Sequence, residues 1–316
     1  MLLIISLLTG CIPTNESIKT SFPTVSTTQA SVSPSLSSNS ESPTPIITQT
    51  APVSTLVPVP TLGTEDAVGI LRNYLKNQPP CQLPCWGGIT PGKSTLSDVQ
   101  NQLTAFSGIS ERAYFGEAGD SWITGNFRIK FDEKISIWPH YLASSSDETI
   151  MFVSISTGST ESREGAIYAG RGYNELFFAY TLPQIVSTYG LPPQTFMTAD
   201  INVAEPTAPD YFVIRLLYPD LGIFVSYTMP VETGGNNYKF CPSESLVYMD
   251  LIPQGHSNDY KDLFKQKGNL EWSLSPTPYD KSNGEALGIT DEEFYRLIVS
   301  SPNRCFESPI NIWPEP

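Results

Sequence analysis

Five cysteines are the residues of this sequence whose chemistry depends most on position: Cys11, Cys81, Cys85, Cys241 and Cys305. Cys11 follows an apolar run, Met1–Leu8, and a small residue, Gly10, which together are typical of a secretory signal and its cleavage site. In an exported chain the other four cysteines favour two disulfides, for which three pairings exist.

Among these pairings we favour a local clamp between Cys81 and Cys85 and a long-range bridge between Cys241 and Cys305. The second bridge would close a loop long enough to contribute about 4 kcal/mol if it is unstrained. A zinc site is the alternative, and it needs two C-x2–4-C pairs or histidines at matching spacing. Cys81 and Cys85 supply one such pair, but the other two cysteines stand alone and neither histidine lies near them. We therefore predict disulfides and no metal or cofactor.

Two histidines are the candidates for acid–base catalysis. His140 lies in a strand-like stretch, IWPHY, and we interpret it as an ordinary residue near the end of a strand. His256 lies in a polar loop with Ser257 and Asp259, the ingredients of a hydrolytic triad. Closeness in sequence is not triad geometry, the sequence contains no G-x-S-x-G turn, and Ser257 is better placed to cap the following helix. Among the 32 acidic residues, none stands out as a pair for glycoside hydrolysis.

Two further stretches partly match ligand-binding loops. GGITPGKS, which ends at Ser94, has the spacing of a phosphate-binding loop, but Pro91 removes an amide donor and no apolar strand precedes it. DKSNGEALGITDEE is acidic, but its glycines miss the calcium-loop register, so we predict a solvated turn before a capped helix. Trp86, beside the predicted clamp, is our candidate contact residue, because loop tryptophans anchor protein or glycan partners. Core packing is its alternative role.

LTGC, at Leu8–Cys11, resembles the lipobox of bacterial lipoproteins. The resemblance implies that the Cys11 thiol carries a diacylglycerol and that residues 1–10 are removed as a signal peptide. Several acyl chains, at about 0.8 kcal/mol per buried methylene, anchor a protein stably at a membrane. One departure is that no Lys or Arg precedes the apolar run. An ordinary secretory signal is the alternative, since eight apolar residues fall short of the roughly 20 that span a bilayer.

Residues 11–60 are predicted to form a disordered tether. More than half of residues 12–60 are Ser, Thr or Pro, so this segment buries too little apolar surface to offset its ordering entropy. Its prolines favour extended conformations that would hold the folded part away from a membrane. The net charge of −14 argues against nucleic-acid binding, which needs clustered Lys and Arg. No later stretch approaches 18 consecutive apolar residues, so no further membrane span is predicted.

The rest of the chain is predicted to form two units, each with a helix followed by strands. In the first, 61–170, helices are expected at 64–77 and after Thr95, whose pairing with Asp98 forms a capping box. Period-two alternation predicts a strand at 121–133, and further strands are expected at 135–141 and 148–156.

The second unit, 171–316, is predicted to begin with a helix between Thr181 and the stop residue Gly190. Strands are expected at 195–203, 210–219, 221–229 and 244–252, and helices after the cap residues Ser257 and Thr290. Aligning Thr95 with Thr181 places Val99 on Ile185, which suggests an internal repeat.

This order of elements is similar to tandem SmpA/BamE-like modules and to beta-lactamase-inhibitor proteins, in which TPGKSTLSDVQNQL and TLPQIVSTYGLP resemble the helix-opening segment. The resemblance implies protein binding rather than catalysis, and it maps no functional residue. We expect an α+β fold with antiparallel sheets and packed helices. We expect a non-enzymatic binding or scaffold module, anchored by lipid on the extracytoplasmic side of the membrane, whose partner is an envelope protein or glycan. An extracellular hydrolase with an unidentified site is the alternative.

Overall fold

The computed structural model describes the chain at 61–77, 81–106, 109–117, 122–130, 135–159, 171–200, 210–256 and 279–313. These ranges belong to one compact unit, Leu56–Pro316. The predicted signal peptide (1–10), the predicted lipidation site Cys11, the predicted tether (11–60) and the helix predicted after Ser257 lie outside the described residues.

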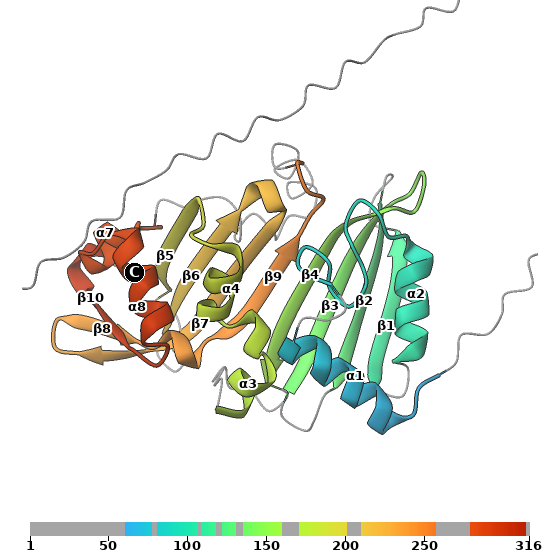
Figure 1. Ribbon diagram of the computed structural model, residues 1–316, viewed down its shortest axis with the longest axis horizontal. Coiled ribbons are helices and arrows are strands. Elements are labelled where there is room, and N and C mark those ends of the chain that lie inside the picture. Colours follow the sequence, from blue (N-terminus) through green and yellow to red (C-terminus); the bar gives the residue numbers. More distant parts are fainter. Residues whose placement is uncertain are drawn as a thin grey trace, which may run out of the picture. The chain divides into compact units, whose positions relative to one another are not determined.

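A single antiparallel sheet forms the centre of the fold (Figure 1). Its main path runs in the order β1-β2-β3-β4-β9-β7-β6-β5. The strands are β1 (Ser110–Glu117), β2 (Trp122–Lys130), β3 (Ile135–Ser144), β4 (Ile150–Ser159), β5 (Gln194–Asp200), β6 (Tyr211–Tyr218), β7 (Ile223–Gly234) and β9 (Leu246–Leu251). With its packed helices, this sheet confirms the predicted α+β class.

The two halves of the sheet have the same layout from edge to centre. In the first, α2 (Leu96–Ala105) leads into β1 at one edge, and the strands follow inward to β4. In the second, α4 (Leu182–Tyr189) leads into β5 at the other edge, and β6, β7 and β9 follow inward. The halves meet where β4 pairs with β9, from Val153–Leu251 to Ser156–Tyr248. The repeated order of elements therefore builds one continuous sheet.

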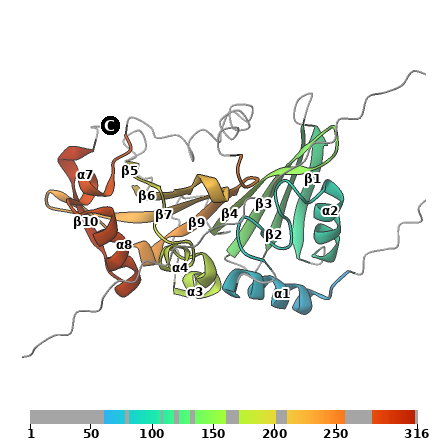
Figure 2. The ribbon, with the colours of Figure 1, turned by 45° about the horizontal axis from the view of Figure 1, so that its top comes forward.

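Helices cover one face of this sheet. Figures 1 and 2 show α1 (Thr64–Asn77), α3 (Arg171–Leu176) and α4 on the same side. The apolar stripe of α1 is buried at Ala67, Leu71 and Leu75, in the same cluster as the inward side chains of the strands. Alternation along each strand decides which side chains join this core.

The C-terminal part packs at the end of the second half. It adds β8 (Asn237–Phe240), which pairs with β7 and with β10 (Phe306–Pro309), and the helices α7 (Asn283–Leu287) and α8 (Asp291–Ser300). Short 3-10 turns complete the chain: η1 (Phe178–Tyr180), η2 (Pro219–Leu221), η3 (Pro242–Glu244) and η4 (Ile310–Ile312).

Local signals in the sequence explain the element ends. Thr95 and Asp98 form the predicted capping box of α2, and Gly190 ends α4 with φ of +78°. Gly222 turns the β6–β7 hairpin in the left-handed region, and a Cβ there would lie 2.3 Å from the carbonyl oxygen of Ile252. A side chain at position 222 would therefore displace backbone, and only glycine fits.

One predicted turn is wrong. The stretch DKSNGEALG contains the helix α7, and Ser282 and Glu285 form its capping box. Asn283 is fully buried rather than solvated, and its side-chain amide donates to Asp291 at 2.8 Å. The helix and its capping box were not predicted because glycines such as Gly284 and Gly288 are typical of turns.

Both predicted disulfides are confirmed. Cys81 bonds to Cys85, and Cys241 bonds to Cys305 across 64 residues. The longer bridge joins the residue after β8 to the residue before β10. It lies beside a stacked pair of rings, Phe212 and Phe240, whose centroids are 3.7 Å apart.

Candidate functional site

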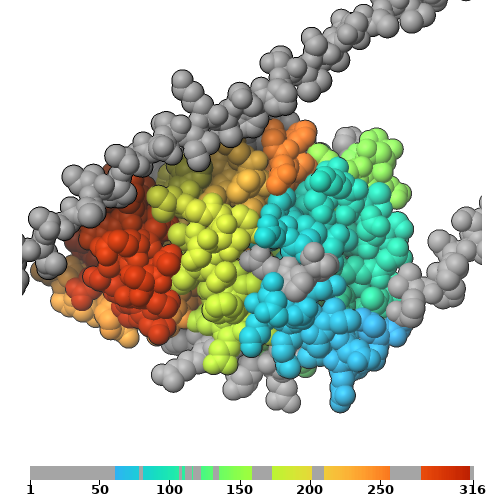
Figure 3. All heavy atoms as spheres, viewed as in Figure 1, coloured from blue at the N-terminus to red at the C-terminus, as the bar shows by residue number. Residues whose placement is uncertain are grey.

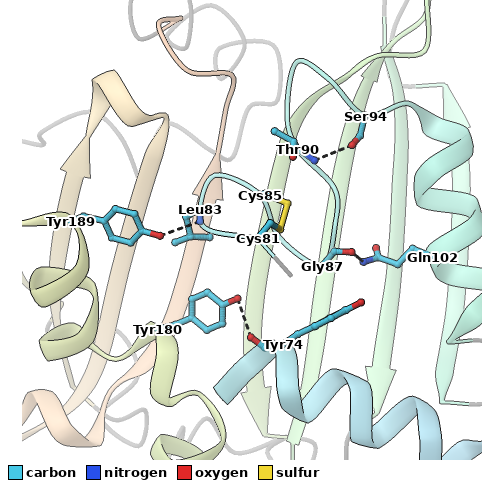
Figure 4. Close-up of a disulfide and its surroundings, with 10 residues drawn as sticks. All are labelled: Tyr74, Cys81, Leu83, Cys85, Gly87, Thr90, Ser94, Gln102, Tyr180 and Tyr189. Carbon is cyan, nitrogen blue, oxygen red and sulfur yellow. Dashed lines mark hydrogen bonds between the residues drawn. A yellow bond between two sulfur atoms is a disulfide. The ribbon is translucent and has the colours of Figure 1, made fainter. Parts of the chain in front are cut away.

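A disulfide-closed loop, 81–94, lies on the helix-covered face where the two halves meet. Figure 4 shows it between α4 on one side and α2 on the other. In Figure 3 the blue and teal atoms of α1 and this loop meet the yellow-green atoms of α3 and α4 near the middle of that face. The Cys81–Cys85 bridge closes its first five residues, and Gly87, Gly88 and Gly92 adopt positive φ.

Polar contacts fix the loop to the first half. The Gln102 side chain of α2 donates to the carbonyl oxygen of Gly87 at 2.7 Å, and the Tyr141 hydroxyl of β3 donates to the same glutamine at 3.0 Å. The amide of Gly92 donates to the carbonyl of Ile150 at 2.6 Å. These bonds connect the loop to one helix and two strands of the first half.

Tyrosine hydroxyls tie the loop and α1 to the second half. The amide of Leu83 donates to the Tyr189 hydroxyl of α4 at 3.0 Å. The Tyr180 hydroxyl of η1 donates to the carbonyl of Tyr74 in α1 at 3.3 Å. The loop and α1 are thus the structural link between the helix layers of the two halves.

Trp86 is not a contact residue of this loop. Its side chain is 1% exposed and belongs to the main core with Leu83 and Ile89. The backbone of Trp86 pairs with Ile89 in both directions, which turns the indole inward. The role that we proposed for Trp86 as a binding residue is therefore corrected to core packing, the alternative stated above.

The structure also explains why GGITPGKS is not a phosphate cradle. The amides of Ile89, Thr90, Gly92, Lys93 and Ser94 donate to partners within the protein, and the Ser94 hydroxyl accepts from Thr90. A phosphate needs such amides to be available. The backbone amides of this loop instead hold the loop in place within the protein.

The sheet places three catalytic residue types side by side on its other face. His140, Ser154 and Asp250 are direct neighbours across β3, β4 and β9. Yet the Ser154 hydroxyl donates to Tyr248 at 2.9 Å, and the His140 ring bonds to Thr124 at 2.8 Å. The serine–histidine bond of a hydrolytic triad is therefore not formed.

The other predicted site residues are only partly described. His256 ends a turn in which its amide donates to Pro253, while Ser257 and Asp259 lie outside the described residues. The four cysteines in disulfides offer no thiolate to zinc. Within the described ranges no group of three His, Cys, Asp or Glu side chains is arranged to hold a metal ion. The helices in these ranges include none long and apolar enough to cross a membrane.

Several tyrosines are buried in the core of the protein. Among the described residues, burial raises the pKa of eight tyrosines: Tyr141, Tyr173, Tyr180, Tyr189, Tyr218, Tyr227, Tyr238 and Tyr295. In the unfolded chain the tyrosine pKa is about 10. The folded state therefore holds protons that the unfolded state releases above this pH. These groups contribute stability that is fully present below pH ~10 and is lost as the pH rises beyond it.

We expect the protein to unfold cooperatively in alkali above pH ~10. Tyrosine ionisation, followed by ultraviolet absorbance, should coincide with the loss of far-ultraviolet circular dichroism. If the buried tyrosines ionised near pH ~10 while the dichroism stayed unchanged, the described packing would be contradicted.

No protein-family model, curated protein or solved structure matches this chain. The likeness to SmpA/BamE-like modules therefore stays a hypothesis, and the function has to be argued from the residues.

Proposed function

We propose that this protein is a lipid-anchored extracytoplasmic lipoprotein whose folded part is a non-enzymatic binding or scaffold module. The observation that carries the proposal is the pair of disulfides, because such bridges persist in oxidising compartments outside the cytoplasm. LTGC at Leu8–Cys11 supplies the attachment site, and the Ser/Thr/Pro-rich stretch after it supplies the spacer.

The helix layer of the second half is the proposed contact surface. Phe178 in η1, Leu191 after α4 and Val299 in α8 are 53%, 51% and 47% exposed. α4 contacts both η1 and α8, so these side chains belong to one layer. Aromatic anchors such as Phe178 supply much of the binding energy in many protein interfaces, and the aliphatic neighbours help to exclude water around them. This favours an envelope protein as the partner.

Fractionation and cross-linking in the native cell test both parts of the proposal. The unaltered protein should sediment with membranes, and Cys11→Ser should move to the soluble extracytoplasmic fraction because it lacks the acyl chains. A photoreactive phenylalanine analogue at position 178 should give a discrete cross-linked species of higher mass.

Two matched controls separate these results from misfolding. The double variant Cys81→Ser/Cys85→Ser keeps Cys11 and should stay with the membrane. The same analogue at Lys130, which is exposed on the opposite face of the sheet, should give no discrete product. Membrane attachment of Cys11→Ser would refute the anchor, and equal cross-linking at both positions would refute the contact surface.

A further inference from the structure

The Cys81–Cys85 bridge differs in setting from the other disulfide. It joins cysteines four residues apart, whereas Cys241–Cys305 spans 64 residues. Both sulfur-bearing residues are partly exposed, and Gln82 between them is exposed. A soluble thiol can therefore approach this bridge while the protein is folded.

The bridge controls the position of the Leu83 amide. Leu83 lies inside the five-residue ring and donates its N–H to the Tyr189 hydroxyl of α4 at 3.0 Å (Figure 4). Leu83 is 5% exposed, so this part of the disulfide-closed ring is buried in the core. Opening the ring removes the constraint that aims this donor at the second half.

The opposite end of the loop is held without the bridge. Gly87 accepts from Gln102, and Gly92 donates to Ile150, both in the first half. These contacts remain when the sulfur–sulfur bond is cut. Reduction therefore loosens the link to α4 and leaves the link to the first half in place.

We propose that Cys81–Cys85 is a redox-sensitive latch that couples the helix layers of the two halves. A dithiol is the reductant. Its thiolate attacks one sulfur to form a mixed disulfide, and its second thiol then displaces the remaining cysteine. The S–S bond of the protein becomes two thiols, and the dithiol becomes a disulfide. The latch acts whether or not Cys11 carries lipid.

Limited reduction of the purified full-length protein tests the latch. We expect dithiothreitol at neutral pH, without denaturant, to make Cys81 and Cys85 available for alkylation while Cys241–Cys305 stays bridged. Amide hydrogen exchange in α4 should then speed up by roughly tenfold, the size expected for losing one partly buried hydrogen bond. Exchange in α2 should change little.

Two variants check the assigned contact. Tyr189→Phe removes the acceptor hydroxyl, so its α4 should exchange faster at the outset and respond little to dithiothreitol. In Cys81→Ser/Cys85→Ser, hydrogen exchange in α4 should be as fast as in the reduced protein and should not change when dithiothreitol is added. If this variant does not fold, the result with the unaltered chain still decides. Resistance of the bridge until global unfolding, or unchanged α4 exchange after its reduction, would overturn the proposal.

Discussion

Replacing Cys241 and Cys305 by serine should lower the free energy of unfolding by about 4 kcal/mol. The bridge closes a loop across 64 residues, and cross-linking a long loop removes much entropy from the unfolded chain. It also fixes β8 against β10, beside the Phe212–Phe240 stack. Urea denaturation followed by tryptophan fluorescence measures the loss.

The matched control is Cys81→Ser/Cys85→Ser. Its cysteines are four residues apart, and so short a loop corresponds to only about 2 kcal/mol. Equal losses in the two variants would show that loop closure is not what the long bridge contributes.

Removing one partner of the buried ion pair between Arg215 and Asp280 should cost about 3–5 kcal/mol. One guanidinium nitrogen lies 2.8 and 3.0 Å from the two carboxylate oxygens, and the Thr198 hydroxyl also donates to the carboxylate. The side chains are 10% and 1% exposed, so either single variant leaves a charge in the interior. Asp280 precedes Lys281, whose backbone pairs with Met197 in β5. The ion pair therefore holds the start of the C-terminal part against the sheet.

The double variant Arg215→Ala/Asp280→Ala is the control for this prediction. It leaves no unpaired charge, so its loss in urea denaturation should be smaller than the sum of the two single losses. Additive losses would mean that the two side chains do not act as a pair.

Local patterns accounted for most of the helices and strands. The caps at Thr95 and Thr290, the period-two alternation in β2 and the apolar runs of β6 and β7 are short-range signals. β1 went unpredicted because SERAYFGE mixes charged and apolar residues without alternation, and its pairing is irregular between Glu111 and Tyr114. α3 went unpredicted because six residues are too few to show a helical period.

The loop at the junction of the halves was harder to predict than its disulfide. The spacing of Cys81 and Cys85 indicates that they pair with each other. The partners that place the loop, Tyr189 and Ile150, are 106 and 58 residues from the loop residues that they bond, Leu83 and Gly92. No local rule joins positions so distant. The same limit applies to Trp86, whose burial depends on elements that pack over it.

His140, Ser154 and Asp250 are a second example of a contact that the sequence does not reveal. Their sequence separation hides that they are cross-strand neighbours, and this emerges only from the register of three strands. Even then the His140 ring bonds to Thr124 and the Ser154 hydroxyl donates to Tyr248. Residue types alone therefore cannot identify a catalytic site in this fold.

The most direct test of the proposed anchored module is the mass of the amino-terminal peptide of protein purified from its native cell. The proposal predicts a chain that begins at Cys11, with the added mass of a diacylglycerol on that residue. An amino-terminal peptide that begins at Met1 and carries an unmodified Cys11 would contradict it.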